Sequence, residues 1–181
     1  VNILSLSWPN AAQPRPALPS SSEPKPEYAN PCALATKRPM AFNSITRLRL
    51  RSLLLLPAFA RESRAIAAQA AQTPGYLSGA VLAEGWMVFW TRTAWDSETA
   101  MKAFRDSGAH RASMPKLLDW CNEAVVAHWQ GEPEGDWVKI HERMARDGRK
   151  SKVRKPSKAH EEGAIGPLRR WSPEQPIPSA K

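Results

Sequence analysis

The chain has 181 residues, a formal net charge of +9 and 42% hydrophobic residues. This length suits one folded domain with extensions, and Cys32 and Cys121 are too few for a disulfide framework or a structural metal site. No apolar run approaches the ~18 residues that a membrane-spanning helix needs, and no secretory signal is visible. We therefore expect a cytoplasmic protein with no membrane partner.

Residues 1–41 predict a disordered arm. Eight of the chain's 17 prolines fall there, and the segment has no sustained hydrophobic period. It therefore cannot bury enough apolar surface to offset the entropy of ordering it. The chain begins with Val1, and Met40 stands immediately before the first strand-like run. Two interpretations stay open: translation begins at Met40, or the arm is genuine and flexible.

The next segment, residues 42–130, has the order strand, helix, strand, strand, helix, strand. The first strand is expected over residues 43–52, where leucines alternate with arginines and give one apolar face. Pro57 suits the first turn of a helix, which runs through an alanine-rich stretch and ends near Thr73. The apolar stripe of this helix is expected to cover one face of a sheet.

The remaining elements of this segment are a hairpin over residues 76–95, a second helix that Gly108 ends, a helical turn or two, and a fourth strand over residues 124–129. This order is the α+β, ferredoxin-like βαββαβ arrangement, with both helices on one face of a four-stranded antiparallel sheet. The other face would expose aromatic and arginine side chains. Pairing with a second sheet across a two-fold axis would cover it, so we expect a homodimer that forms an α/β barrel.

Residues 131–181 predict a short helix followed by a basic, flexible tail. The helix is expected over residues 136–148, with Trp137, Ile140 and Met144 on one stripe. The cations that follow have no interleaved aromatic residues and no recognition motif. This composition is typical of a solvated tail, so we expect no specific nucleic-acid binding.

Several pieces of the sequence resemble one protein family. They are TRLRLRS at residues 46–52, GYLSGAVL, FWTRTAWDSETAMKAF, SGAHRASMP and DWCNEAVVAHW, and they span about half of the chain, residues 43–130. They resemble the antibiotic-biosynthesis-monooxygenase-like group of the dimeric α/β-barrel superfamily, in an uncharacterised bacterial branch. The resemblance implies a ferredoxin-like protomer, a homodimer, and a cavity between sheet and helices in each protomer.

The same resemblance implies a range of activities rather than one. Relatives include oxygenases of phenols and quinols that need no cofactor, haem-degrading enzymes, other haem proteins, and members with no demonstrated activity, so the fold does not fix the reaction. The leading expectation is a monooxygenase-like protein that acts on a small aromatic or quinol-type molecule and requires no cofactor. The alternatives are a haem-binding protein that uses His110 and a non-enzymatic dimeric ligand-binding module.

His110 is the first candidate site residue. It follows Gly108 just beyond the second predicted helix, where a break in the chain can turn the imidazole toward the cavity as a general base, a hydrogen-bond anchor or an axial haem ligand. The other interpretation is a structural histidine that binds a neighbouring carbonyl. Haem-degrading relatives place a ligand histidine in this region, but the matching position here is Met114, which argues against haem degradation.

Arginine and tryptophan side chains supply the candidate binding residues. Arg47 and Arg49 share one face of the first strand and are candidates to bind an anionic ligand. Trp86, Trp90 and Trp95 are candidate walls for a planar aromatic ligand. The odd spacing of Trp90 and Trp95 places them on opposite faces of their strand, so only one of the two can line the pocket.

Asn43 is the second candidate catalytic residue, on the resemblance alone: in cofactor-independent relatives an asparagine near the start of the first strand helps to orient substrate and oxygen. Glu123 and His128 lie on opposite faces of the last strand, and we interpret both as structural. Cys121 is interpreted as a small buried apolar residue. The sequence has no phosphate loop and no metal-ligand cluster.

Overall fold

Four antiparallel strands form the centre of the structure, a computed structural model that describes residues 40–169 and 172–179. The predicted arm lies outside the described residues up to residue 39. The elements follow the βαββαβ order: β1 (Ala41–Leu50), a short 3-10 helix η1 (Leu53–Leu55), α1 (Leu56–Gln72), β2 (Tyr76–Glu84), β3 (Val88–Trp95), α2 (Glu98–Arg105), α3 (Gly108–Trp120) and β4 (Cys121–Gly131).

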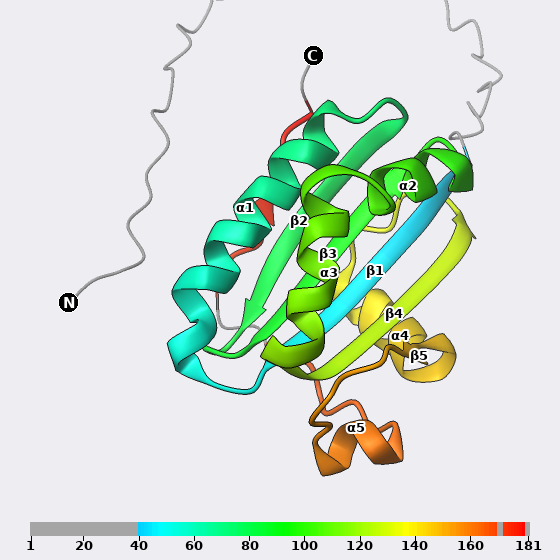
Figure 1. Ribbon diagram of the computed structural model, residues 1–181. Helices are drawn as coiled ribbons and strands as arrows, with labels where there is room; N and C mark the ends of the chain where they lie inside the picture. The colour runs from blue at the N-terminus through cyan, green and yellow to red at the C-terminus, as the bar shows by residue number, and fades with distance from the viewer. Residues whose placement is uncertain (1–39, 170–171, 180–181) are drawn as a thin grey trace, which may run out of the picture. The chain divides into compact units, whose positions relative to one another are not determined.

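The sheet order β4-β1-β3-β2 confirms the predicted ferredoxin-like fold. Two short strands, β5 (Arg149–Lys150) and β6 (Gln175–Pro176), extend the sheet at its two edges, beside β4 and β2. The hairpin turn between β2 and β3 contains Gly85, whose φ of +70° is the left-handed conformation that glycine adopts without strain. The elements are shown in Figure 1.

β1 is a central strand, paired with β3 on one side and β4 on the other. Its side chains alternate between the two faces of the sheet, as the sequence predicted. Leu48 and Leu50 contact the helices, whereas Ile45 belongs to an apolar cluster on the other side. Arg47 lies on the same face as Ile45.

The helices α1, α2 and α3 cover one face of the sheet (Figure 1). Between them and the strands lies a core of large aromatic and aliphatic side chains: Phe42, Tyr76, Trp95, Met101 and Phe104, with Leu50, Phe59 and Cys121 nearer the end of β1. Each of these side chains is less than 9% exposed. The apolar residues of the helices therefore bury this face, as their stripes predicted.

The helical turn or two expected after Gly108 is instead the 13-residue helix α3. Ser107 precedes it in extended backbone conformation, and Gly108 begins the helix with a φ of +52°. Any side chain at Gly108 would meet the amide of Gln69, because a Cβ there would lie 2.9 Å from it. His110 thus lies in the first turn of a helix and not in a loop.

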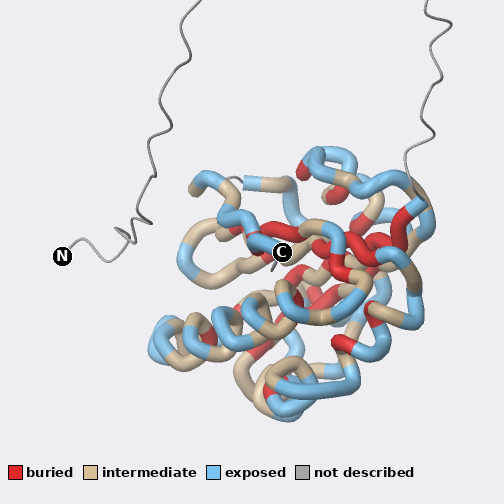
Figure 2. Tube along the Cα trace, turned by 90° about the horizontal axis from the view of Figure 1, so that it is seen from above, coloured by how far each residue is buried: buried red, intermediate tan, exposed pale blue. Residues whose placement is uncertain are grey.

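A second layer covers the opposite face of the sheet. Its main element is α4 (Trp137–Asp147), which begins at the N-cap Asp136. Trp137, Ile140 and Met144 are at most 2% exposed and pack against side chains of all four central strands. The predicted stripe of the helix is therefore its buried face. Figure 2 shows buried segments running through the middle of the molecule between exposed outer turns.

The homodimer was expected because this second face was thought to be open. The structure covers it with α4 and with the extended stretch through Ile165 and Leu168, which follows the short helix α5 (Lys158–Glu162). The sequence had predicted only a flexible tail after the helix. The reason given for the dimer thus does not hold, and the dimer itself stays a prediction.

We expect Ile140→Ala to lower the free energy of unfolding by about 2 to 5 kcal/mol, because the truncation leaves a cavity between α4 and the sheet. Val138→Ala, on the exposed side of the same helix, is the matched control and should change it by less than about 0.5 kcal/mol. Urea denaturation measures both. Equal effects would mean that α4 does not pack on the sheet.

Candidate functional site

His110 lies on the helix side of the sheet, at the corner where α2 gives way to α3. Its Nδ1 is 2.9 Å from the carbonyl oxygen of Arg105, and its ring packs edge-on against Phe104 with 4.9 Å between ring centroids. The backbone N–H of His110 donates to Oε1 of Gln69 at 2.9 Å. The imidazole is therefore held in one orientation by two helices.

These contacts define the protonation of His110. A carbonyl only accepts hydrogen bonds, so Nδ1 carries the proton and Nε2 presents a lone pair. Burial is the main effect that lowers the pKa of His110, and the nearby charge of Arg105 also lowers it. The hydrogen bond to the Arg105 carbonyl and the charge of Asp106 raise the pKa, but they do not outweigh burial, so the pKa lies below its ordinary value. The ring is thus neutral at neutral pH. A neutral imidazole with a free lone pair can accept a proton or ligate a metal.

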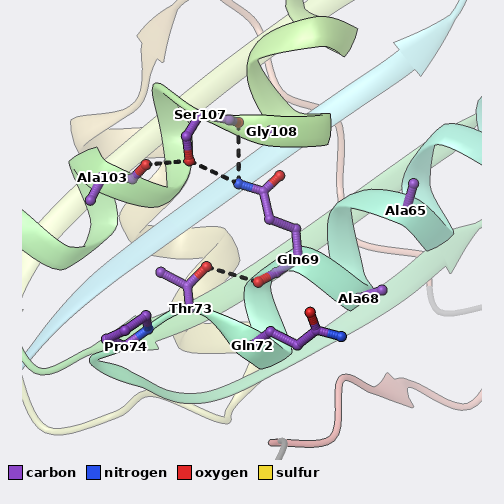
Figure 3. Close-up of a pocket in the computed structure, with 9 residues that line it drawn as sticks. All are labelled: Ala65, Ala68, Gln69, Gln72, Thr73, Pro74, Ala103, Ser107 and Gly108. Atoms are coloured by element: carbon purple, nitrogen blue, oxygen red, sulfur yellow. Dashed lines mark hydrogen bonds between the residues drawn. The ribbon is translucent and has the colours of Figure 1, made fainter.

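A shallow groove lies beside this corner, between α1 and the α2–α3 junction (Figure 3). One side is apolar and small, with Ala65, Ala68, Pro74 and Ala103. The side next to α3 is formed by Gln69, Ser107 and Gly108. A second open pocket, lined by Arg105, Asp106, Arg111 and Met114, lies on the other side of the same corner. His110 therefore lies between two surface depressions rather than in a closed cavity.

Gln69 holds the corner together. Its Nε2 donates to the carbonyl oxygens of Phe104 at 3.0 Å and Ser107 at 3.1 Å, and its Oε1 accepts the His110 N–H. Gln69 is not among the predicted site residues, because one glutamine in an alanine-rich helix gives no signal of a contact with residues some forty positions away. Its partners could be identified only from the packing of α1 against α2 and α3.

Asn43, predicted to be catalytic, lies on the opposite side of the sheet. It is 1% exposed. Its Nδ2 donates to the carbonyl oxygen of Glu132, and its Oδ1 accepts the N–H of Glu134, each at 3.1 Å. Both hydrogen bonds go to the loop that leads from β4 into α4. Asn43 therefore positions α4 on the sheet.

Arg47 and Arg49 also lie on the α4 side, and both contact Glu123 of β4. Arg47 Nη1 is 2.6 Å from Glu123 Oε2, in a pair whose side chains are both 8% exposed, and Arg49 is 3.6 Å from Oε1. The hydroxyl of Ser157 donates to the same carboxylate at 3.0 Å. The structural role predicted for Glu123 agrees with this geometry, whereas the charge of Arg47 is already neutralised within the chain.

Burial alone would raise the pKa of Glu123. The hydrogen bond and charge of Arg47 outweigh that effect, with smaller contributions from Ser157 and Arg49, and the pKa lies below its usual value. The carboxylate is therefore charged at neutral pH. The Arg47 guanidinium also lies 5.7 Å from the centroid of the Trp90 ring, which is its cross-strand neighbour.

The three candidate tryptophans lie in three different places. Trp90 is fully buried on the α4 side, with its Nε1 2.8 Å from Glu84 Oε2. Trp95 is fully buried on the helix side and donates to Thr93 Oγ1 at 2.9 Å. Their opposite faces agree with the parity of the sequence. Trp86 lies in the β2–β3 turn and is 52% exposed.

The structure therefore divides the predicted site between the two faces of the sheet. His110 lies on the helix side, with Trp95 in the core behind Phe104. The other group, on the α4 side, comprises Asn43, Arg47, Arg49 and Trp90. These residues do not form one pocket.

Other reactive groups do not add to a site. Cys121 is fully buried, and burial raises the pKa of its thiol to about 12, so it is not a thiolate at neutral pH. His128 lies on the helix side of β4, with its Nδ1 3.2 Å from Arg149 Nη2. Among residues 40–169 and 172–179, no group of three or more histidine, cysteine or acidic side chains could hold a metal ion. In the same residues, no helix is long and apolar enough to cross a membrane.

Comparisons with known proteins find no matching family model and no match among curated proteins. Solved structures do match. One is provisionally assigned as an antibiotic biosynthesis monooxygenase from Nitrosomonas europaea, with 17% identity, 50% of this chain and 97% of that chain covered, and a TM-score of 0.46. Another is SnoaB, a cofactor-independent oxygenase from Streptomyces nogalater, with 13% identity, 54% and 96% covered, and a TM-score of 0.43.

A third match, from Chloroflexus aurantiacus, is also provisionally assigned as an antibiotic biosynthesis monooxygenase. It has 19% identity, 54% of this chain and 95% of that chain covered, and a TM-score of 0.39. The matched proteins include ones assigned to the group that the sequence resembles. At these values the matches say nothing about activity, so function has to be inferred from the geometry of this chain.

We expect Glu123→Gln to lower the free energy of unfolding by about 3 to 5 kcal/mol, because the buried Arg47 loses its countercharge. The lowered pKa means that the stabilisation is present above the ordinary value of 4.5 and is lost as the pH falls through the lowered pKa. The difference in the free energy of unfolding between wild type and Glu123→Gln should therefore become smaller at acid pH. Urea denaturation across this pH range measures it.

The matched control is Glu98→Gln, which removes an exposed ion pair with Lys102 and should leave the stability nearly unchanged. If the two variants have equal stability at neutral pH, the pair of Arg47 and Glu123 is not a buried ion pair in solution.

Proposed function

We propose that the chain is a monooxygenase-like protein that binds a small phenol or quinol on the helix side of the sheet and uses His110 as a base. The observation that carries this proposal is the fixed, neutral imidazole: Nδ1 is held by the Arg105 carbonyl and Nε2 retains its lone pair. When His110 accepts the proton of a phenolic hydroxyl, the phenolate that forms is richer in electrons and more reactive toward dioxygen. Dioxygen is the oxidant: one of its atoms becomes a quinone oxygen of the product and the other leaves as water. No cofactor is needed for that proton transfer.

The groove between α1 and the α2–α3 junction is the proposed binding place. Its alanine and proline side suits the face of a small aromatic ring, and Gln69 and Ser107 give it a polar end close to the backbone of His110. Arg47, Arg49, Asn43 and Trp90 are not part of this proposal, because they lie beyond the sheet and are engaged there. Because these candidate catalytic and binding residues are not available to the groove, a second candidate function is a non-enzymatic module that binds a small molecule there.

Haem binding depends on the same nitrogen. The hydrogen bond from Nδ1 to a carbonyl leaves Nε2 as the nitrogen that could bind a metal, so His110 is the residue that would hold the iron of a haem. A porphyrin would also need a large apolar surface beside it, and the two grooves at this corner are shallow and partly polar. We therefore favour proton transfer without haem.

We expect His110→Ala to reduce kcat/KM for oxidation of a phenol or hydroquinone by about 100-fold or more, because a positioned base is lost. The measurement is oxygen uptake by the full chain with a panel of such compounds. The wild-type rate should fall as the pH drops through the lowered pKa of His110, below its ordinary value of 6.5, since the protonated ring cannot act as a base.

His128→Ala is the matched control, because His128 is another half-buried histidine with a pKa lowered mainly by burial. It should leave the rate unchanged. Saturable binding of the same compounds without oxygen uptake would support the binding module instead. If the purified protein has a haem absorption band that disappears in His110→Ala, His110 is a haem ligand and not a base.

A further inference from the structure

Two leucines project from an ordered turn at the end of β1. Leu53 and Leu54 belong to η1, and they are 53% and 91% exposed. The turn is fixed by Ser52, whose hydroxyl accepts the N–H of Leu54. Because the turn is hydrogen-bonded, it holds these apolar side chains in water, where they cost free energy unless another surface covers them.

A third exposed apolar side chain lies nearby. The N–H of Leu50, at the end of β1, donates to the carbonyl oxygen of Met87 at 2.8 Å, which joins the β2–β3 turn to the start of η1. Trp86, beside Met87, is 52% exposed. Leucine and tryptophan together are the side chains that enter the boundary between lipid headgroups and acyl chains.

A strip of cations runs past the same end of the sheet. Residues 149–158 contain six lysines and arginines and no acidic residue. This segment is pinned along β4 and the end of α3, with the N–H groups of Ser151, Arg154 and Ser157 donating to the carbonyl oxygens of Ala124, Leu118 and Asn122. Val153 packs into the core, so Lys152 and Arg154 on either side of it face solvent.

The strip and the chain that leads from β1 into η1 both contact Asp119. Arg154 Nη1 is 3.3 Å from its carboxylate, and Arg51 Nε donates to its carbonyl oxygen. The backbone N–H of Arg51 also donates to the carbonyl oxygen of Trp120. Arg51 precedes Leu53 by two positions. Figure 1 shows the β1–α1 connection, the start of β4 and α5 at one end, at the bottom of the view.

We propose that this end of the molecule binds an anionic lipid surface. Leu53 and Leu54 enter the interface, and Arg51, Lys152, Arg154 and Lys155 lie at the level of the lipid phosphates. All four cationic residues are exposed. The charge complementarity selects an anionic surface, and the leucines select lipid over nucleic acid, whose phosphates would engage the cations and leave the aliphatic side chains in water.

The sequence predicts no membrane partner, because no run of its residues can span a bilayer. That reasoning does not apply to a peripheral contact, which needs only an apolar contact a few ångströms deep and nearby cations. The helix-side groove and His110 lie outside this surface. The proposal is therefore independent of the proposed oxidation chemistry.

The test is sedimentation of the full chain with vesicles of phosphatidylcholine that contain about one third phosphatidylglycerol, compared with vesicles of phosphatidylcholine alone. We expect binding to the anionic vesicles that weakens as salt is added. Leu54→Glu should lower the partition coefficient at least about tenfold, because an apolar side chain is replaced by an anion. Lys155→Ala should lower it about fivefold.

Each variant has a matched control elsewhere on the surface. Val138→Glu replaces a residue that is 55% exposed on α4, and Lys139→Ala removes an exposed cation beside it. Both should bind vesicles as wild type does. Circular dichroism checks that Leu54→Glu is folded, which its exposure leads us to expect.

Several results would overturn the proposal. One is the absence of vesicle binding by wild type, and another is equal binding by Leu54→Glu and Val138→Glu. A third is salt-sensitive binding to duplex DNA that Leu54→Glu does not change, without binding to vesicles, which would assign the strip to nucleic acid. A fourth is a dimer, measured by light scattering, that becomes a monomer in Leu54→Glu without vesicle binding, which would assign the leucines to a second copy of the chain.

Discussion

Both faces of the central sheet have to be buried, and the rest of the chain is arranged around that requirement. The first face is covered by α1, α2 and α3, as in any βαββαβ unit. The second face carries Ile45, Leu82 and Trp90, which together would form a large apolar patch in water. Helix α4 covers it. An 11-residue helix is marginal by itself, so the sheet stabilises α4 as much as α4 shields the sheet.

Charged residues on the α4 side decide where the C-terminal segment lies. Arg47 and Arg92 are cross-strand neighbours of apolar residues, so each guanidinium needs a carboxylate partner to offset the cost of removing its charge from water in the layer between sheet and helix. Glu123 of β4 supplies one, and Glu174 supplies the other at 3.1 Å while it also accepts from Trp137 Nε1 at 2.7 Å. Such pairs add little net stability, but a single unpaired partner is costly.

The contact of Glu174 brings the end of the chain back to β3, and Tyr76 reinforces this position through its hydroxyl, which donates to the carbonyl oxygen of Ile177 at 2.8 Å. The described residues between α4 and β6 have little regular secondary structure of their own. Their course is therefore fixed by specific polar contacts and by the packing of Val153, Ile165 and Leu168 against the core, rather than by helix or strand propensity. This explains why composition alone predicted a flexible tail there: Lys, Ser and Pro content does not reveal which acidic residue will meet a buried arginine.

The periodic features of the sequence were predictable, and the long-range contacts were not. Alternation in β1 and the odd spacing of Trp90 and Trp95 correctly assigned faces, because side-chain direction in a strand is a local property. The apolar stripe of α4 could also be predicted, because helical periodicity is a local property of the sequence. The identity of Trp137, Ile140 and Met144 does not indicate which surface they pack on. Treating that surface as open led to the expectation of a homodimer. The sequence also left open which face of the sheet lines the cavity, so the candidate site combined Arg47 with His110, which the sheet separates. The contacts of Gln69 with the α2–α3 corner were also unpredictable from the sequence, because they depend on tertiary packing.

Since parts of the same chain cover both faces of the sheet, the surfaces that the described residues leave for ligands are the outside of the layers and the ends of the sheet. These two regions differ in chemistry. The groove beside Gln69 is small, lined by alanine and closed at its back by the helices, which suits a small molecule with few charges. The end that carries η1 has leucines exposed on a hydrogen-bonded turn and cations in a segment that runs along β4. Because Leu54 is 91% exposed, no walls enclose it, and a partner that covers it has to be a larger surface rather than a small molecule.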